Sequence, residues 1–156
     1  MRILGFDPGY GRLGFGVIDV ARGKASAVAF GVITTKAGEK HQERLLEIHN
    51  DAESLVKAHK PDLIAIEELF FAKNVTTGLK VAEVRGILLM LAAKYKVGVR
   101  EIKPVEVKMA LTGYGKADKR QMQDMVKAVF GLSKIPRPDD AADALAIAWA
   151  AQNHKL

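Results

Sequence analysis

The chain contains no cysteine, only 6% aromatic residues and no long hydrophobic run. The absence of cysteine excludes disulfide bonds, thiolate nucleophiles and cysteine-ligated zinc or iron–sulfur sites, and it suits a reducing cytoplasm. No apolar run approaches the roughly 18 to 20 residues that a membrane span requires, and the first residues lack the apolar core of a signal peptide. We therefore expect a soluble, cytoplasmic and unprocessed protein.

Hydrophobic residues and positive charge are abundant. The 156 residues are 49% hydrophobic and 27% charged, which predicts a single domain spanning residues 1–156. The 24 Lys and Arg residues exceed the 18 Asp and Glu residues, so the formal net charge is +6. This excess favours polyanionic partners, nucleic acids above all.

Hydrophobic periodicity divides the chain into strands and helices. Alternating or continuous apolar runs predict strands at residues 2–7, 13–20, 27–35, 62–69 and 98–103. Apolar residues spaced by three and four predict helices at residues 39–60, 76–96, 104–111, 117–130 and 139–154. This order predicts an α/β fold with a mixed five-stranded sheet, in which an antiparallel meander lies beside parallel strands and helices cover both faces.

The helix predicted at residues 76–96 is apolar on two sides, so it needs two partners. One partner is the sheet. The other is either a second copy of the protein, with Gly78 and Gly86 allowing close approach, or the rest of the same monomer. The sequence leaves both alternatives open.

Familiar cofactor and hydrolase motifs are absent or out of context. Residues 9–14 (GYGRLG) match the dinucleotide fingerprint G-x-G-x-x-G, but a strand rather than a helix is predicted to follow, so a hairpin turn explains these glycines better. The chain has no Walker lysine loop, no G-x-S-x-G elbow and no H-E-x-x-H helix. Its four histidines show no metal-ligand spacing.

Four carboxylates remain as candidates for chemistry. Asp7 and Glu67 end the first and fourth predicted strands, whereas Asp140 and Asp143 lie on one face of the last helix. If these two strands are parallel neighbours, their acids meet at the carboxyl edge, where open α/β sheets bind ligands. Converging carboxylates repel one another unless they are protonated or neutralised, usually by a hard divalent cation. The pattern predicts a Mg²⁺ or Mn²⁺ site that hydrolyses phosphodiesters with two ions.

Each acid also has a structural interpretation. Asp7 suits a turn before Pro8, Asp139 or Asp140 suits a helix N-cap, and Glu67 suits a solvated strand end. Asp143 resists this explanation, because a lone carboxylate in the apolar run of residues 141–148 (AADALAIA) requires a partner. The joint pattern therefore favours the metal site.

Segments at residues 5–9 (GFDPG), 64–67 (IAIE), 70–74 (FFAKN) and 140–146 (DAADALA) together resemble the bacterial RuvC family of Holliday junction resolvases. Their order and spacing cover nearly the whole chain. The resemblance implies a ribonuclease H-like fold, a homodimer, and magnesium-dependent nicking of four-way DNA junctions at symmetric positions in two strands. It also implies that the protein works with the RuvA and RuvB branch-migration proteins in recombination and repair.

The resemblance assigns roles by position. It implies two Mg²⁺ ions per site, with Mn²⁺ as a substitute. The catalytic and metal-binding acids that it implies are Asp7, Glu67, Asp140 and Asp143.

The same resemblance implies DNA contacts. Phe70 matches the aromatic residue that such enzymes press against junction bases, which suits stacking in an opened strand, although the ring of Phe71 is an alternative. Lys73 belongs to the same loop. Lys108 and Lys119 match basic residues near the active site, where they would contact phosphate or stabilise developing charge; the structural alternative is a solvated helix lysine.

Three other functions compete with this one. RNA-processing nucleases of the YqgF type share the opening around Asp7 but are shorter and lack the FFAKN loop. The actin, heat-shock chaperone and sugar-kinase group binds ATP between two such domains. The length of this chain predicts only one domain, so we expect no ATP binding. A non-catalytic nucleic-acid-binding module would explain the charge alone, and its binding would depend on salt but not on magnesium or Asp7.

Overall fold

A computed structural model describes residues 1–69 and 75–152 and contains one five-stranded sheet with the order β3-β2-β1-β4-β5. The meander pairs β1, β2 and β3 antiparallel, and β1, β4 and β5 are parallel. This arrangement confirms the predicted mixed sheet. The strands are β1 (Arg2–Asp7), β2 (Arg12–Ala21), β3 (Lys24–Thr34), β4 (Leu63–Glu67) and β5 (Gly98–Ile102).

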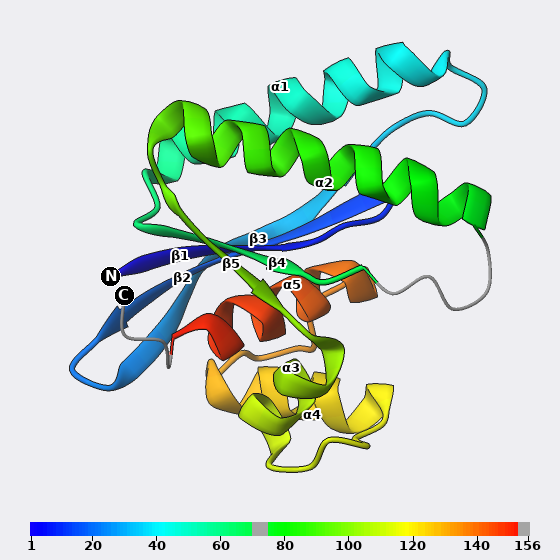
Figure 1. Ribbon diagram of the computed structural model, residues 1–156. Coiled ribbons are helices and arrows are strands. Elements are labelled where there is room, and N and C mark those ends of the chain that lie inside the picture. The colour runs from blue at the N-terminus through cyan, green and yellow to red at the C-terminus, as the bar shows by residue number, and fades with distance from the viewer. Residues whose placement is uncertain (70–74, 153–156) are drawn as a thin grey trace.

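Helices cover both faces of this sheet (Figure 1). On one face lie α1 (His41–His59) and α2 (Val75–Tyr95); on the other lie α3 (Pro104–Thr112), α4 (Lys119–Val129) and α5 (Asp139–Ala151). No helix in residues 1–69 and 75–152 has the length and hydropathy needed to cross a bilayer.

The hairpin between β2 and β3 is tighter than the sequence indicates. We predict the third strand from residue 27, but pairing continues to the Ala21↔Lys24 pair, so β3 begins at Lys24. Arg22 and Gly23 alone form the turn, both with positive φ (51° and 76°). Two such residues match the twist of the flanking strands and let the ladder run to the end of the hairpin.

Strand β1 contributes to two hydrophobic cores, one on each face of the sheet, because its alternate side chains point to opposite faces. Ile3 packs with α5, α3 and α4, whereas Leu4 and Phe6 pack with α1 and α2. All three side chains are fully buried. The last residue of this buried strand, Asp7, is therefore held by packing on both sides.

Helix α5 lies against the sheet more closely than ordinary side chains permit. Glycines of β1 and β2 face it: a Cβ added at Gly5 would be 2.4 Å from the Ala144 carbonyl oxygen, and one at Gly14 would be 2.1 Å from that of Asp140. The alanine-rich surface of α5 provides the other half of this contact. The close approach positions the start of α5, with Asp140, beside the β1–β2 hairpin.

We expect Gly14→Ala to destabilise the protein by about 1 to 3 kcal/mol, the usual cost of overpacking a core. The added methyl group would collide with the backbone of Asp140, which cannot move without displacing α5. Urea unfolding of the variant measures this loss. Gly11→Ala is the control, because a Cβ at Gly11 would meet only Arg44 Nη2 at 3.9 Å, an ordinary van der Waals distance. Equal stability of Gly14→Ala and the native chain would contradict the close packing.

Candidate active site

Two of the predicted acids lie side by side at the carboxyl edge of the sheet. Strands β1 and β4 are parallel, and Phe6 lies opposite Ile66. Asp7 and Glu67 are the next residues of the two strands and end them side by side. The condition set by the sequence, that the first and fourth strands are parallel neighbours, is met. Backbone pairing alone therefore brings together residues 60 positions apart.

The other two acids come from the first turns of α5. Asp143 lines a pocket together with Asp7 and Glu67. Asp140 is not among the residues that line this pocket, and its carboxylate lies 3.7 Å from the Arg12 guanidinium at the start of β2. The structure thus brings three acids directly around one cavity and places the fourth at its margin.

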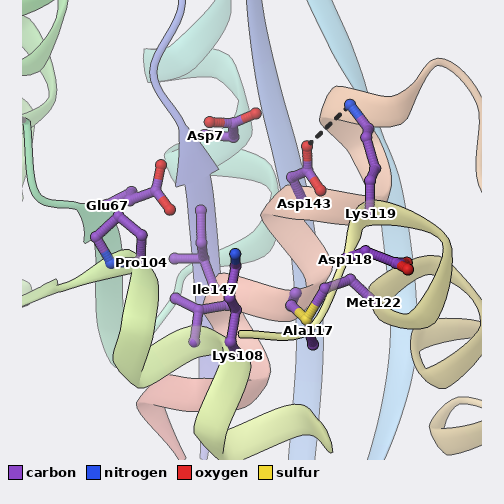
Figure 2. A pocket seen from close by; sticks show the side chains of 12 residues that line it. Asp7, Glu67, Pro104, Lys108, Ala117, Asp118, Lys119, Met122, Asp143 and Ile147 are labelled. Atoms are coloured by element: carbon purple, nitrogen blue, oxygen red, sulfur yellow. Dashed lines mark ion pairs between the residues drawn. The ribbon is translucent and has the colours of Figure 1, made fainter. Parts of the chain in front are cut away.

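This pocket has a volume of about 240 Å³. Figure 2 shows Asp7, Glu67 and Asp143 along one side, with Lys108 of α3 and Lys119 of α4 extending toward them. Its floor is apolar and comes from α3, α4 and α5. The apolar and proline lining residues are Pro104, Val107, Ala117, Met122, Ala146 and Ile147.

Burial, followed by mutual repulsion, raises the pKa values of the three acids that line the pocket. Burial, followed by the charges of Asp143, Glu67 and Asp140, raises the pKa of Asp7 to about 7. Burial and then Asp143 raise the pKa of Glu67, against the opposing charge of Lys108. Burial also raises the pKa of Asp143, although Lys119 acts in the other direction. The acids are close enough for each to disfavour ionisation of the next, which a bound cation would relieve.

Both predicted lysines approach the acids. Lys119 Nζ donates to Asp139 at 3.0 Å and lies 3.9 Å from Asp143 Oδ2, and the bond to Asp139 raises the pKa of Lys119. Lys108 lines the same pocket, near Glu67. Each lysine remains able to meet a phosphate, since Lys119 is 59% exposed and Lys108 faces the cavity.

Comparison with known proteins identifies the family. The family model described as crossover junction endodeoxyribonuclease RuvC matches residues 3–151. The chain belongs to the RuvC family. A RuvC of Chloroflexus aurantiacus is 50% identical over 148 residues, covering 95% of this chain and 90% of that protein.

Solved RuvC structures have the same fold. The Thermus thermophilus RuvC structure superposes with a TM-score of 0.88 at 36% identity, covering 96% of this chain and 92% of that one. The structure of T. thermophilus RuvC in complex with a Holliday junction substrate gives the same TM-score at 34% identity, with the same coverage. These matches confirm the predicted family, the ribonuclease H-like fold and the class of enzyme, an endodeoxyribonuclease.

The donor chemistry of the pocket in this RuvC family member suits Mg²⁺ or Mn²⁺. The candidate ligands Asp7, Glu67 and Asp143 supply only carboxylate oxygens, which hard divalent cations prefer. In residues 1–69 and 75–152, however, no three Asp, Glu or His side chains converge tightly enough to hold an ion as they stand. Asp143 instead approaches Lys119. The residues therefore fit the metal by type and location, and their side chains must close around it.

Two predicted DNA-contacting residues, Phe70 and Lys73, lie outside the described residues, as does the alternative ring of Phe71. Their roles stay predictions.

Sequence analysis missed two residues at this site. Arg12 was grouped with the turn glycines, yet it is the partner of Asp140. Asp139 is not among the acids that the resemblance assigns, yet it holds both Lys119 and Arg137, each through an ion pair. The contacts of Arg12 with Asp140 and of Lys119 with Asp139 join residues that are far apart in the chain, so no spacing rule could have revealed them.

Proposed function

We propose that this chain resolves four-way DNA junctions by paired, symmetric nicks in two strands, in DNA recombination and repair. One observation carries the proposal: Asp7 and Glu67, at the ends of parallel neighbouring strands, line a pocket with Asp143, beside two lysines. Its family relationship to a RuvC solved with a Holliday junction substrate supports the choice of DNA.

In this mechanism the four acids act as ligands. Asp7, Glu67 and Asp143 would hold two Mg²⁺ ions, with Asp140 completing the set from the margin, and Mn²⁺ would substitute because it also prefers oxygen donors. When bound, these ions would supply an activated water and stabilise the departing 3′ oxygen. Asp7 must be ionised to serve as a ligand, and burial together with the neighbouring carboxylates, which raise its pKa, opposes ionisation in the absence of a cation.

The two lysines of the pocket would contact the negatively charged phosphate of the substrate. Lys108 and Lys119 flank the acids from α3 and α4, so the scissile phosphate would meet positive charge opposite the ligands. Phe70 and Lys73, which follow β4 in the sequence, would add stacking and phosphate contacts. The net charge of +6 favours binding to DNA generally.

A homodimer would supply the second active site that paired nicks require. Of the two apolar sides predicted on α2, one is buried through Val84, Leu88 and Leu91. The other is solvent-exposed: Leu79 is 56% exposed, and a Cβ at Gly86 would meet nothing within 4 Å. An apolar helix face of this kind favours an interface with a second copy. The exposed large hydrophobic residues of α2 are Val75, Leu79, Leu89 and Met90.

We expect Leu79→Glu to weaken this dimer by roughly 30-fold or more, since a charge replaces an apolar contact worth about 2 kcal/mol at an interface centre. Sedimentation velocity at micromolar concentration would show a monomer, and junctions would receive single rather than paired nicks. Met109→Glu is the matched control, because Met109 is 51% exposed on α3, across the sheet from α2. A dimer that survives Leu79→Glu and dissociates with Met109→Glu would move the interface to the other face.

We further propose that the chain acts in the cytoplasm, together with RuvA and RuvB. The absence of cysteine agrees with a reducing compartment, and junction branch points must be moved to cleavable positions before they are cut. Membership in the RuvC family supports the choice of these two partners.

The direct test is cleavage of a labelled synthetic four-way junction in magnesium and in EDTA, with a linear duplex and a single-stranded RNA as controls. Paired, symmetric nicks in the junction alone, lost in EDTA, are the expected result. Cleavage of the RNA would instead favour an RNA-processing nuclease, and binding without cleavage would favour a non-catalytic module.

A further inference from the structure

A cluster of polar and charged residues around Tyr10 lies outside the pocket, and none of the steps above uses it. Tyr10 belongs to the turn of residues 8–11 that joins β1 to β2. Asp7 directly precedes this turn and Arg12, the partner of Asp140, directly follows it. The turn is tight, since a Cβ at Gly9 would be 2.2 Å from the Arg12 carbonyl oxygen. The turn therefore connects directly to a candidate metal ligand on one side and to the partner of Asp140 on the other.

Helix α1 and the end of β3 hold Tyr10 by its side chain and its backbone. The hydroxyl group is 2.9 Å from His41 Nδ1, and the Arg44 Cζ atom is 3.9 Å from the centroid of the Tyr10 ring. The Tyr10 carbonyl oxygen accepts from Arg44 Nη2 at 3.3 Å and from Thr35 Oγ1 at 3.5 Å. Arg44 also donates from Nε to Thr35 Oγ1 at 2.9 Å, and it is buried. The turn is thus attached by several directional contacts rather than by one.

Helix α2 extends this network. Nε2 of His41 bonds to the Glu83 carboxylate, and Lys80 Nζ lies 4.7 Å from the Tyr10 ring centroid. His41 therefore bonds to both the Tyr10 hydroxyl and Glu83, and the Tyr10 ring contacts two cations. Contacts from both helices converge on a single residue of the turn.

We propose that Tyr10, held by His41 and Glu83, is a positioning residue that fixes the turn between Asp7 and Arg12 and thereby sets how tightly the acidic pocket binds divalent metal. This inference rests on the proposed metal site. Ligands must be held within about 0.5 Å of their binding geometry, and four like charges resist that geometry. A rigid turn reduces the freedom that Asp7 loses on binding metal, because the fold has already fixed its neighbours.

The hydroxyl group of Tyr10 can be removed without disturbing its ring. Tyr10→Phe keeps the cation–π contacts with Arg44 and Lys80 and loses only the bond to His41. Because a partly exposed hydrogen bond contributes about 1 kcal/mol, the thermal midpoint should fall by less than about 4 °C. Metal affinity should change more visibly than stability.

Binding of Mn²⁺ to the DNA-free protein tests the proposal independently of cleavage. Titration followed by the electron paramagnetic resonance signal of free Mn²⁺ gives the dissociation constant. For Tyr10→Phe and for His41→Ala we expect an increase of roughly 3- to 10-fold, below the about 10- to 100-fold typical when a partner bonded directly to a metal ligand is lost. Tyr114→Phe is the matched control: Tyr114 is 54% exposed after α3, and its variant should bind Mn²⁺ like the native chain.

Rescue and additivity distinguish positioning from a general loss of structure. His41→Gln should restore near-native Mn²⁺ affinity, since the amide oxygen can accept from Tyr10 and the amide nitrogen can donate to Glu83. The double variant Tyr10→Phe/His41→Ala should bind no more weakly than His41→Ala, because both changes break the same connection.

Unchanged Mn²⁺ affinity in Tyr10→Phe and His41→Ala, with tight binding by the native chain, would overturn this inference and leave the proposed function intact. Failure of His41→Gln to rescue, or additive effects in the double variant, would also overturn it. No Mn²⁺ binding by the native chain, or binding that persists in Asp7→Asn, would overturn the proposed metal site as well.

Discussion

Asp7→Asn is expected to abolish cleavage of four-way junctions while leaving junction affinity within about threefold of the native value, since phosphate contacts from lysines rather than the acids supply binding. A bound metal stabilises the transition state by several kcal/mol, and each 1.4 kcal/mol is about tenfold in rate, so we expect a loss of about 1000-fold or more. Asparagine keeps the size and shape of Asp7 but removes the charge. Single-turnover cleavage and a gel-shift titration of the same labelled junction measure the two effects separately.

Glu67→Gln should have the same consequence, and its neighbour provides a matched control. Glu68 is the next residue in the chain but does not line the pocket. Glu68→Gln therefore changes the net charge equally and should retain cleavage. Loss of junction binding in Asp7→Asn with an unchanged fold, or equal loss of cleavage in Glu67→Gln and Glu68→Gln, would contradict the assigned separation of metal and DNA contacts.

Most of the fold could be predicted from the sequence because its elements differ sharply in periodicity. The run of residues 63–66 is continuously apolar, as a strand covered on both faces must be, and β4 begins and ends within one or two residues of the predicted strand. Boundaries were less predictable where turn geometry decides. The last helix ends at Ala151 within the described residues, short of the predicted residue 154, and β3 starts earlier than predicted because two residues suffice for its hairpin.

The candidate site was predictable to the extent that backbone pairing determines it. The order of strands brings Asp7 to Glu67, and helix spacing places Asp140 and Asp143 on one face. What the sequence could not indicate is how the long basic side chains distribute themselves among the acids. Arg12 approaches Asp140, which lies at the margin of the pocket. This contact depends on the close packing of α5 on the glycines of β2, which only the assembled fold brings about.

In EDTA at about pH 8, we expect Asp7→Asn to be more stable than the native chain by on the order of 2 to 4 kcal/mol, equivalent to roughly 5 to 15 °C in thermal midpoint. Burial and neighbouring acids raise the pKa of Asp7 from 3.8 to about 7. A carboxyl group with a higher pKa in the folded state than in the unfolded state disfavours folding when it ionises. The penalty is absent below pH 3.8, increases between pH 3.8 and about 7, and is complete above that.

The pH dependence and its response to metal identify this cause. The stability difference should grow by about 1.4 kcal/mol per pH unit between about pH 4 and 7 and then level off. Asp51→Asn, which removes an exposed carboxylate on α1 outside the pocket, is the matched control for the loss of one negative charge. Magnesium should raise the midpoint of the native chain more than that of Asp7→Asn, because only the native chain retains the full set of ligands. A constant stability difference across this range, or equal magnesium shifts in the two proteins, would contradict the account. The carboxylate that catalysis requires is thus expected to reduce the stability of the metal-free fold, which connects metal binding directly to folding at this site.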